Sequence, residues 1–473
     1  MKRAPRVPTS LVPALVLALA GLTRAAAADP GLSTPGPLAP DWPPWTPAPE
    51  CAPAEVSAAS PLCASPGEAC ALMDDVRVRC HGADLAFGAV RGGGHVLFSH
   101  PVRSRPRRLA TVTAAGATFS GPLPWDGEAG AIYPDPNGEP HLFLYGLRPA
   151  GGVAYAFPGA DGTWIREEVV SGWPAVAMGV AFDATGRVHA VIGHPVERGP
   201  AEIATRAADG RWTTTRLAPE TVGWPALVSA GGAVFGAAFR ADAQARDLLL
   251  EVFEGGERVG SLPAGPRDAT GYPPVVRLGV LPGVEPPGAG LVALFTRRGE
   301  LALSLPLRGG KGARRVAALF APGSSTCRLP ERGACADGAP PCTEVYAGVV
   351  PYATALVADR AGDLWAAWVE SRDTRTLALH TQRFNAMPVG PRPPPTDTAT
   401  CTASVVERVV EHTLVLAAVQ PGRVAERLRV PVGSATLLGL HREADDLVLG
   451  LAEGSGAFRS ITVRVDRLSV QRR

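Results

Sequence analysis

After residue 82 the chain consists of short apolar runs that are broken by Gly, Asp, Asn and Pro. Apolar positions do not recur every three or four residues, as an amphipathic helix requires. A well-formed example is FDATGRVHAVIGH, residues 182–194, in which Asp183 and Gly186 separate two apolar runs. Because Asp can cap its own backbone and Gly accepts a positive φ, this stretch predicts two strands joined by a tight turn. The whole pattern predicts an all-β protein.

The hairpin pattern repeats along the chain. Three copies carry an Asp, two variable residues and a Gly, and two further markers keep the same phase: a DG-x-W tetrapeptide and a Gly-aromatic-Pro triplet. The Asp pairs and the tetrapeptides of neighbouring units are each 48 residues apart. Three markers in one phase indicate a true internal repeat. The hairpins begin at Asp135, Asp183 and Asp359, the tetrapeptides at Asp161 and Asp209, and the triplets at Gly172, Gly223 and Gly271.

A strand-rich repeat of this length is typical of a β-propeller in which each unit forms one four-stranded blade. The third unit predicts strands at Val176–Phe182, Val188–Gly193, Ala201–Arg206 and Trp212–Leu217. Residues 82–473 give room for six to eight such units, and insertions near residues 282–289 and 323–342 favour seven. A pair of β-sandwiches is the alternative, but it does not require the repeat.

The tetrapeptide stretches GADGTW and AADGRW resemble the Asp-box hairpins of secreted bacterial propellers with sialidase-type repeats. They keep the Asp, Gly and Trp of that motif at Asp161, Gly162 and Trp164. They lack its serine, and the Gly follows the Asp directly. The resemblance implies a propeller fold over most of residues 82–473, but it transfers no catalytic role.

The N-terminus differs in character from the repeat region. Residues 1–28 combine a basic start, an apolar run and a small-residue end, which predicts a secretory signal peptide that is cleaved near Ala28. Residues 29–50 form a Pro-rich linker, and residues 51–81 a small Cys-bearing cap before the propeller. No later run is long and apolar enough for a membrane span, so a secreted or periplasmic protein without membrane insertion is expected.

Charge gives no long-range attraction to nucleic acid. The chain has 46 basic and 44 acidic residues, and the predicted signal peptide contains four of the basic ones and no acidic one. The mature chain is therefore close to neutral, and no nucleic-acid partner is expected. The oligomeric state does not follow from the sequence.

Eight cysteines in an exported chain are most simply explained as disulfides. Their pairing stays open, because eight cysteines allow 105 connectivities. Neither cluster contains a CxxC pair, so no metal site is expected. The disulfide candidates are Cys51, Cys63, Cys70 and Cys80 near the start, and Cys327, Cys335, Cys342 and Cys401 later in the chain.

The Gly-aromatic-Pro triplets provide the candidate ligand-binding residues, which are Trp173, Trp224 and Tyr272. They precede the inner strands, in connections that lie near the channel mouth of a propeller. Aromatic faces in this place can stack on sugar rings or hold an apolar peptide. The alternative is that each ring only wedges between adjacent blades.

Candidate catalytic residues remain unknown. His95, His141 and His189 occupy equivalent positions in three units, where they are either metal ligands or, as we expect, repeated packing residues. His194 has no clear counterpart. The chain lacks GxSxG, HExxH and P-loop motifs, and no cofactor is expected.

Three functional hypotheses follow. The first is an exported propeller that acts as a binding or scaffold module for a glycan or a peptide at the channel mouth. The second is a propeller-fold polysaccharide hydrolase or lyase, which would need two carboxylates that meet only in space. The third is a purely structural surface component without a concave pocket.

Overall fold

The computed structural model describes most of residues 129–464 and, between residues 52 and 119, only the backbone of six strands. The predicted signal peptide and linker lie outside the described residues. So do Cys51, Cys63, Cys70, Cys80, Trp173, Tyr272 and His194, together with the side chain of His95. Other stretches outside the description include residues 242–246, 267–273, 305–312 and 386–396.

Three sheets contain four consecutive antiparallel strands each. Each is a meander, so every strand pairs with the strand next to it in sequence. The first contains β3 (Asp84–Val90), β4 (Gly93–Ser99), β5 (Arg108–Thr113) and β6 (Gly116–Phe119). The second contains β7 (Ala129–Pro134), β8 (Pro140–Tyr145), β9 (Gly152–Pro158) and β10 (Trp164–Ser171). The third contains β18 (Val276–Val280), β19 (Leu291–Arg297), β20 (Glu300–Ser304) and β21 (Ala313–Ala318), with a short 3₁₀ turn at Pro287–Gly290.

A seven-stranded sheet consists of two such units that share one long strand. Its strands are β11 (Val176–Phe182), β12 (Val188–Gly193), β13 (Gly199–Arg206), β14 (Trp212–Ala230), β15 (Ala233–Ala241), β16 (Asp247–Glu254) and β17 (Glu257–Pro266). Strand β14 pairs with β13 as far as Thr221 and with β15 from Val222 onward. It is therefore the outer strand of one unit and the inner strand of the next.

The two remaining sheets have five strands each. One joins β27 (Thr436–Glu443), β28 (Asp446–Ala452) and β29 (Ala457–Arg464) to β2 (Met73–Arg79) and β1 (Ala52–Ser60). N-terminal and C-terminal strands thus share one sheet. The other contains β22 (Ala321–Ser325), β23 (Cys342–Ala358), β24 (Leu364–Asn385), β25 (Asp397–Gln420) and β26 (Arg423–Gly433).

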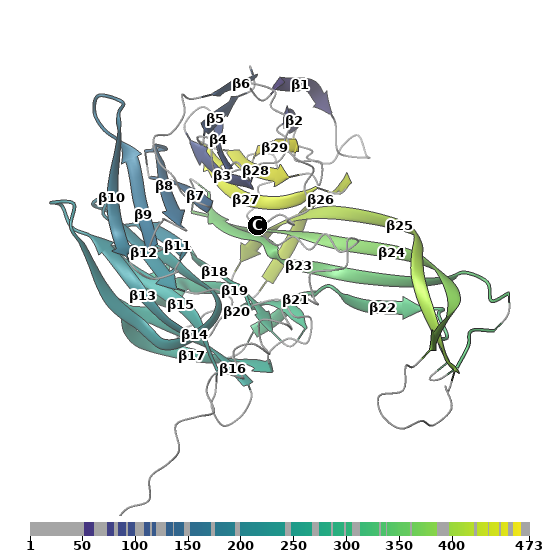
Figure 1. Cartoon of the computed structure of the whole chain (residues 1–473). Helices are drawn as coiled ribbons and strands as arrows, with labels where there is room; N and C mark the ends of the chain where they lie inside the picture. The colour runs from purple at the N-terminus through teal and green to yellow at the C-terminus, as the bar shows by residue number, and fades with distance from the viewer. Residues whose placement is uncertain are drawn as a thin grey trace, which may run out of the picture.

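The sheets stand side by side around a common centre as the blades of a β-propeller (Figure 1). The inner strands β3 and β7 are in contact, and further contacts run from β11 through β14, β18, β23 and β27 back to β3. Between β7 and β11 the contacts are made by β8 and β9 with β11. The predicted all-β propeller fold is confirmed. Seven blades remain a prediction, which the division of the long sheet at β14 favours.

Middle strands are mostly apolar because neighbouring blades cover both faces. Every residue of β12 is buried, from Val188 to Gly193. Outer strands are largely exposed instead, and only Val169 of β10 is buried. The four strands predicted for the third unit are present, and the only large difference is that β14 runs on to Ala230. Side chains of facing sheets interlock into clusters, such as Phe235, Phe239 and Phe295 between the β15 and β19 sheets.

Candidate functional site

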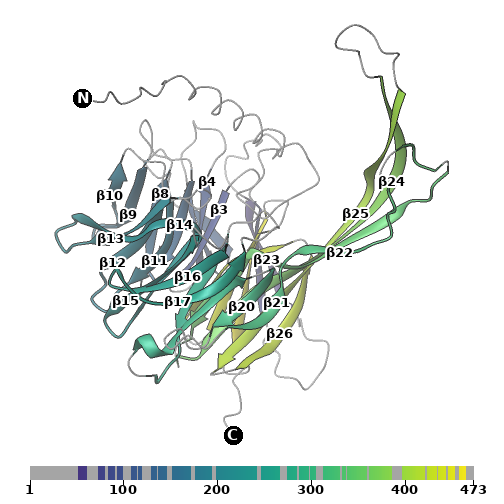
Figure 2. The same ribbon diagram turned by 90° about the horizontal axis from the view of Figure 1, so that it is seen from below.

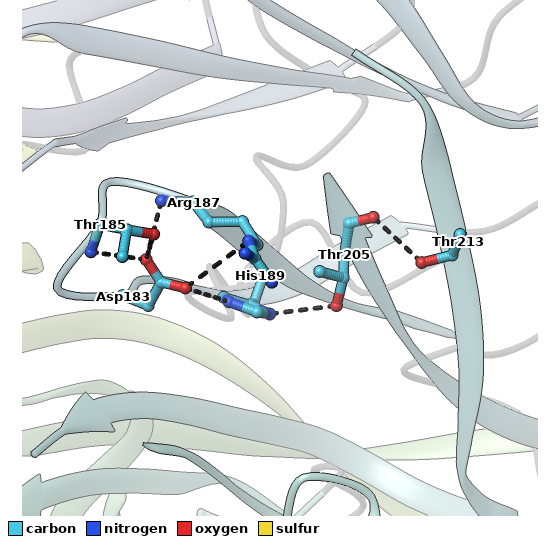
Figure 3. Close-up of polar contacts among 6 residues, drawn as sticks. All are labelled: Asp183, Thr185, Arg187, His189, Thr205 and Thr213. Atoms are coloured by element: carbon cyan, nitrogen blue, oxygen red, sulfur yellow. Dashed lines mark hydrogen bonds and ion pairs between the residues drawn. The ribbon is translucent and has the colours of Figure 1, made fainter. Parts of the chain in front are cut away.

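The first candidate site is the hairpin between β11 and β12, which combines an acid, a histidine and hydroxyl groups (Figure 3). Asp183 Oδ1 accepts hydrogen bonds from the backbone N–H groups of Thr185 and Arg187, both at 2.9 Å. Gly186 has a φ of 79° and donates its N–H to the Asp183 carbonyl at 2.9 Å. The tight turn predicted from Asp183 and Gly186 is therefore confirmed.

His189 links this turn to the next strand. Its Nε2 lies 3.3 Å from Asp183 Oδ2, and its Nδ1 lies 3.0 Å from Thr205 Oγ1 on β13 (Figure 3). Burial lowers the pKa of His189, although the Asp183 carboxylate counteracts part of this effect. Burial raises the pKa of Asp183, but hydrogen bonds from Thr185, Arg187 and His189 together lower it to about 2. The series of acid, imidazole and hydroxyl superficially resembles a hydrolytic triad.

Equivalent hairpins show that this arrangement is structural. Six residues after its turn acid, the third hairpin has Trp365, whose Nε1 donates to Asp359 Oδ2 at 2.9 Å. An indole N–H cannot serve as a general base. In these two hairpins the residue at this position therefore hydrogen-bonds the turn acid, and Trp365 also packs in an apolar cluster between two sheets. The sequence signal is Asp-x-x-Gly-x-x-His/Trp, which links the turn to the strand that follows.

His141 is the matching residue in the second unit. Its Nδ1 hydrogen-bonds the Tyr155 hydroxyl, and its ring stacks on Phe157 with centroids 6.1 Å apart. Since His141 and His189 bond within their own sheets, they do not converge on a common metal. Among the described residues no group of three or more His, Cys, Asp or Glu side chains is placed to hold a metal ion.

We expect His141 to make stability depend on pH. Burial lowers the pKa of His141 from the ordinary histidine value of 6.5 to about 4. Protonation therefore favours the unfolded chain, so this contribution is complete above pH 6.5 and falls as the pH drops toward 4, by about 2–3 kcal/mol. Urea unfolding at pH 7 and at pH 4.5 should show a smaller difference for His141→Phe than for the unchanged chain. The exposed His380 provides the control, because His380→Gln should leave the difference intact.

The second candidate site lies where inner strands of neighbouring blades meet, at Trp224 near the start of the inner half of β14. Its backbone N–H donates to the Pro274 carbonyl at 2.8 Å, and it forms a parallel bridge with Val275. Gly223 has a φ of 81°, and a Cβ there would lie 2.0 Å from the Pro274 oxygen. Two backbones meet at this point without room for a side chain, which explains the glycine of the repeated triplet.

The Trp224 ring meets a second aromatic ring across the inner end of β18. It lies edge-on to Tyr352, with centroids 6.4 Å apart and an interplanar angle of 82°. Tyr352 belongs to the irregular part of β23 between Val349 and Thr354. Both rings are partly exposed, and Trp224 also packs against the apolar cluster around Leu227. The position of Trp224 is thus compatible both with contact to a ligand and with packing between adjacent blades.

Arg277 lies near the start of β18, two residues after Val275, the bridge partner of Trp224. Its Nε donates to the Thr354 carbonyl of β23 at 2.9 Å, and its Nη1 lies 3.4 Å from the Val276 carbonyl. No carboxylate among the described residues forms an ion pair with Arg277, whose side chain keeps part of its surface exposed. Burial lowers its pKa, while the Tyr133 hydroxyl counteracts this effect.

Tyr133 lies on β7 and packs edge-on against Phe143 of its own sheet, with ring centroids 5.9 Å apart. Strands β7 and β18 are not neighbours in the ring of inner strands, but Tyr133 and Arg277 influence each other's pKa. Burial raises the pKa of Tyr133 to about 12, and the Arg277 charge opposes this rise. No hydrogen bond to its hydroxyl occurs among the described residues. Arg277 and Tyr133 are thus a guanidinium group and a phenol, and both can donate hydrogen bonds to an anion.

The sequence indicated Trp224 but missed Arg277, Tyr133 and Tyr352. A signal existed, because VVRLGV places a single cation in an otherwise apolar inner strand. Trp173 and Tyr272 lie outside the described residues, so their proposed role stays a prediction.

The later cysteine group forms two disulfides, which pair Cys327 with Cys342 and Cys335 with Cys401. No cysteine among the described residues is free. The disulfide prediction is confirmed for these four residues. No helix in the described part of the chain has the length and apolarity that crossing a bilayer requires.

Comparisons with known proteins complete the description. No protein-family model matches the chain, and no curated protein matches its sequence. Among solved structures, Sqt1 of Saccharomyces cerevisiae is similar with a TM-score of 0.42 and 11% identity, over 82% of this chain and 97% of that one. The WD40 domain of SCAP from fission yeast is similar with a TM-score of 0.37 and 7% identity, over the same shares.

Proposed function

We propose that this protein is a binding module whose ligand enters the channel mouth at Trp224 and Tyr352. The observation that carries the proposal is Arg277, a guanidinium group on an inner strand without a carboxylate partner in the described chain. Moving such a cation out of water is costly unless an anion or several acceptors compensate. The Thr354 and Val276 carbonyls supply two acceptors, and a ligand anion would supply the rest.

The chemistry of the mouth favours a ligand with a carboxylate and a flat or apolar part. A guanidinium group binds a carboxylate through parallel hydrogen bonds, and the Tyr133 hydroxyl can donate one more. The partly exposed rings of Trp224 and Tyr352 offer faces or edges to a sugar ring or an apolar side chain. An acidic glycan or an acidic peptide satisfies both requirements.

Export is part of the proposal. The basic and apolar N-terminal segment supports a cleaved signal peptide, and the two disulfides fit an oxidising compartment. The hydrolase alternative gains less support. A glycosidase needs a pair of carboxylates around its substrate, whereas the described contacts of Arg277 and Tyr133 include no carboxylate.

Binding can be tested with the purified mature chain on arrays of uronate-bearing oligosaccharides, acidic peptides and their neutral counterparts. We expect binding of carboxylate-bearing probes. Because a hydrogen bond to a charged group contributes about 1.5–3 kcal/mol, Arg277→Gln should weaken binding roughly tenfold to a hundredfold. Arg277→Lys, which keeps the charge, should retain part of the affinity, and Trp224→Leu should reduce it without unfolding the chain.

The matched control is Arg211, which is 86% exposed and pairs with Asp209 on the surface. Arg211→Gln removes the same charge and should leave the affinity unchanged. Equal binding by the Arg277 and Arg211 variants would refute the proposed site, as would equal binding of the acidic and neutral probes.

A further inference from the structure

An arm projects from the propeller and is formed by the outer parts of β22, β23, β24 and β25 (Figure 2). Strands β24 and β25 have 22 and 24 residues, whereas the middle strand β12 of a regular blade has 6. Residues 364–370 of β24 pair with the inner half of β23, within residues 349–358. Residues 371–377 of β24 pair with the outer half of β23, residues 342–348. The propeller core therefore does not need the outer half of this sheet.

Covalent and ionic contacts hold the arm in shape. Asp373 is 1% exposed and binds the guanidinium groups of both Arg375 and Arg408. The Arg375 guanidinium also lies 4.5 Å from the centre of the Tyr346 ring. Farther out, the disulfide between Cys335 and Cys401 attaches the segment between β22 and β23 to β25. Because these contacts already hold the arm in shape, a strand edge of the arm can bind a partner without first losing conformational freedom.

One edge of the arm is open in the described structure. Strand β26 pairs with β25 only from His412 onward, and at the far end Gly333 forms a parallel bridge with Thr400. Between these two points, residues 402–411 of β25 have ladder partners on β24 alone. A strand edge of this kind leaves N–H and C=O groups that can pair with another chain.

The open edge is also apolar. Five large apolar side chains are markedly exposed in the described chain, and three of them lie here: Val405 at 51%, Val406 at 59% and Val409 at 46%. An unpaired edge and exposed valines in the same ten residues are two independent signs of an interaction surface. A strand laid along this edge would satisfy the backbone and cover the valines together.

The geometry points to an extended segment of a partner protein that adds a strand to β25, with basic residues on either side of an apolar one. Glu407 and Glu411 are exposed and have no ion pair in the described chain, whereas Arg408 is already held by Asp373. Glu407, Val409 and Glu411 point to one face of the strand. The complementary partner carries a cation, an apolar residue and a cation at every second position.

Charge also argues against a second copy of this chain. When the regular segment 407–411 pairs antiparallel with its own copy in full overlap, Glu407 lies opposite the copy's Glu411. Like charges directly opposite each other in a sheet are destabilising. On β24, Arg372 lies opposite Glu411 but forms no ion pair with it. Arg372 is not opposite Glu407, so it does not compensate the charge of Glu407 either.

A fluorescent peptide of sequence Thr-Arg-Thr-Val-Thr-Arg-Thr can test this inference by anisotropy with the full mature chain. We expect saturable binding, about tenfold tighter than that of the same peptide with Glu for both Arg. Methylating alternate backbone nitrogens of the peptide should reduce binding at least tenfold, since strand pairing needs those N–H groups. Loss of the charge preference or insensitivity to methylation would overturn strand addition.

Two double variants complete the test. Glu407→Arg with Glu411→Arg should reverse the preference in favour of the Glu peptide. The control, Glu168→Arg with Glu257→Arg, changes the net charge equally at exposed positions elsewhere and should keep the original preference. Sedimentation equilibrium tests the alternative that a second copy of this chain binds the edge. A dimer that dissociates in Val409→Lys would support that alternative and would refute the addition of a partner strand.

Discussion

Replacing Asp373 with alanine is expected to loosen the arm by about 3–5 kcal/mol while the propeller stays folded, because it breaks a buried ionic cluster from one side. The carboxylate is 1% exposed and accepts bonds of 2.8–3.0 Å from the Nε and Nη2 atoms of Arg375 and Arg408. Burial raises the pKa of Asp373, but the bonds from both arginines lower it overall. Without it, the largely buried guanidinium groups of Arg375 and Arg408 would lie close together with no carboxylate between them.

Hydrogen exchange followed by mass spectrometry can measure this effect. Peptides covering residues 371–383 and 401–411 should exchange at least a hundredfold faster in Asp373→Ala, which corresponds to about 3 kcal/mol. Peptides from the propeller strand β19 should be unaffected. Asp209→Ala, which removes the exposed partner of Arg211, provides the control and should change exchange only locally. Unchanged protection of the arm in Asp373→Ala would contradict the assigned role of the cluster.

Asp359→Ala is expected to destabilise the chain by about 2–4 kcal/mol, more than the same change at the equivalent Asp183. Asp359 is 4% exposed and accepts the indole N–H of Trp365, which is 2% exposed. It also accepts the N–H of Asp363 at 2.9 Å, which closes the turn. A buried donor left without its acceptor costs about 1–3 kcal/mol, and the lost turn bond adds about 1 kcal/mol.

The two turn acids form a matched pair for urea unfolding. The Asp183 side chain is 13% exposed, so water can replace its bonds, and Asp183→Ala should cost about 1 kcal/mol. Asp359→Asn keeps one acceptor oxygen and should fall between the two alanine variants. Equal losses for both alanine variants would show that burial of Trp365 does not set the difference.

The features that could be predicted from sequence are those in which neighbouring residues determine the geometry. The Asp183–Gly186 turn needs only its own backbone, and the apolar runs on either side of it form β11 and β12 as expected. The repeated glycine of the triplet could be recognised from the sequence, but the structural requirement for a glycine at this position could not. The clash at Gly223 is with Pro274, fifty-one residues later, which no local pattern reveals.

Long-range contacts account for what the sequence did not predict. Arg277 became a candidate only because its Nε reaches Thr354 of another sheet and because no carboxylate in the described chain pairs with it. The arm was also missed: residues 371–376 are all polar, but a polar run after a strand is equally typical of a loop, and it does not show that the strand continues out of the blade. The resemblance to sialidase-type propellers stays a prediction.

The sheet that combines β2 with β29 has a consequence for how the ring forms during synthesis. Strand β2 pairs with β29 over residues 75–79 and 457–461, so its partner is made almost four hundred residues later. Synthesis proceeds from the N-terminus, and until the end of the chain arrives β2 can pair only with β1. Closure is therefore the last step, and a chain truncated before residue 457 would keep an unsealed ring with an edge open to other chains.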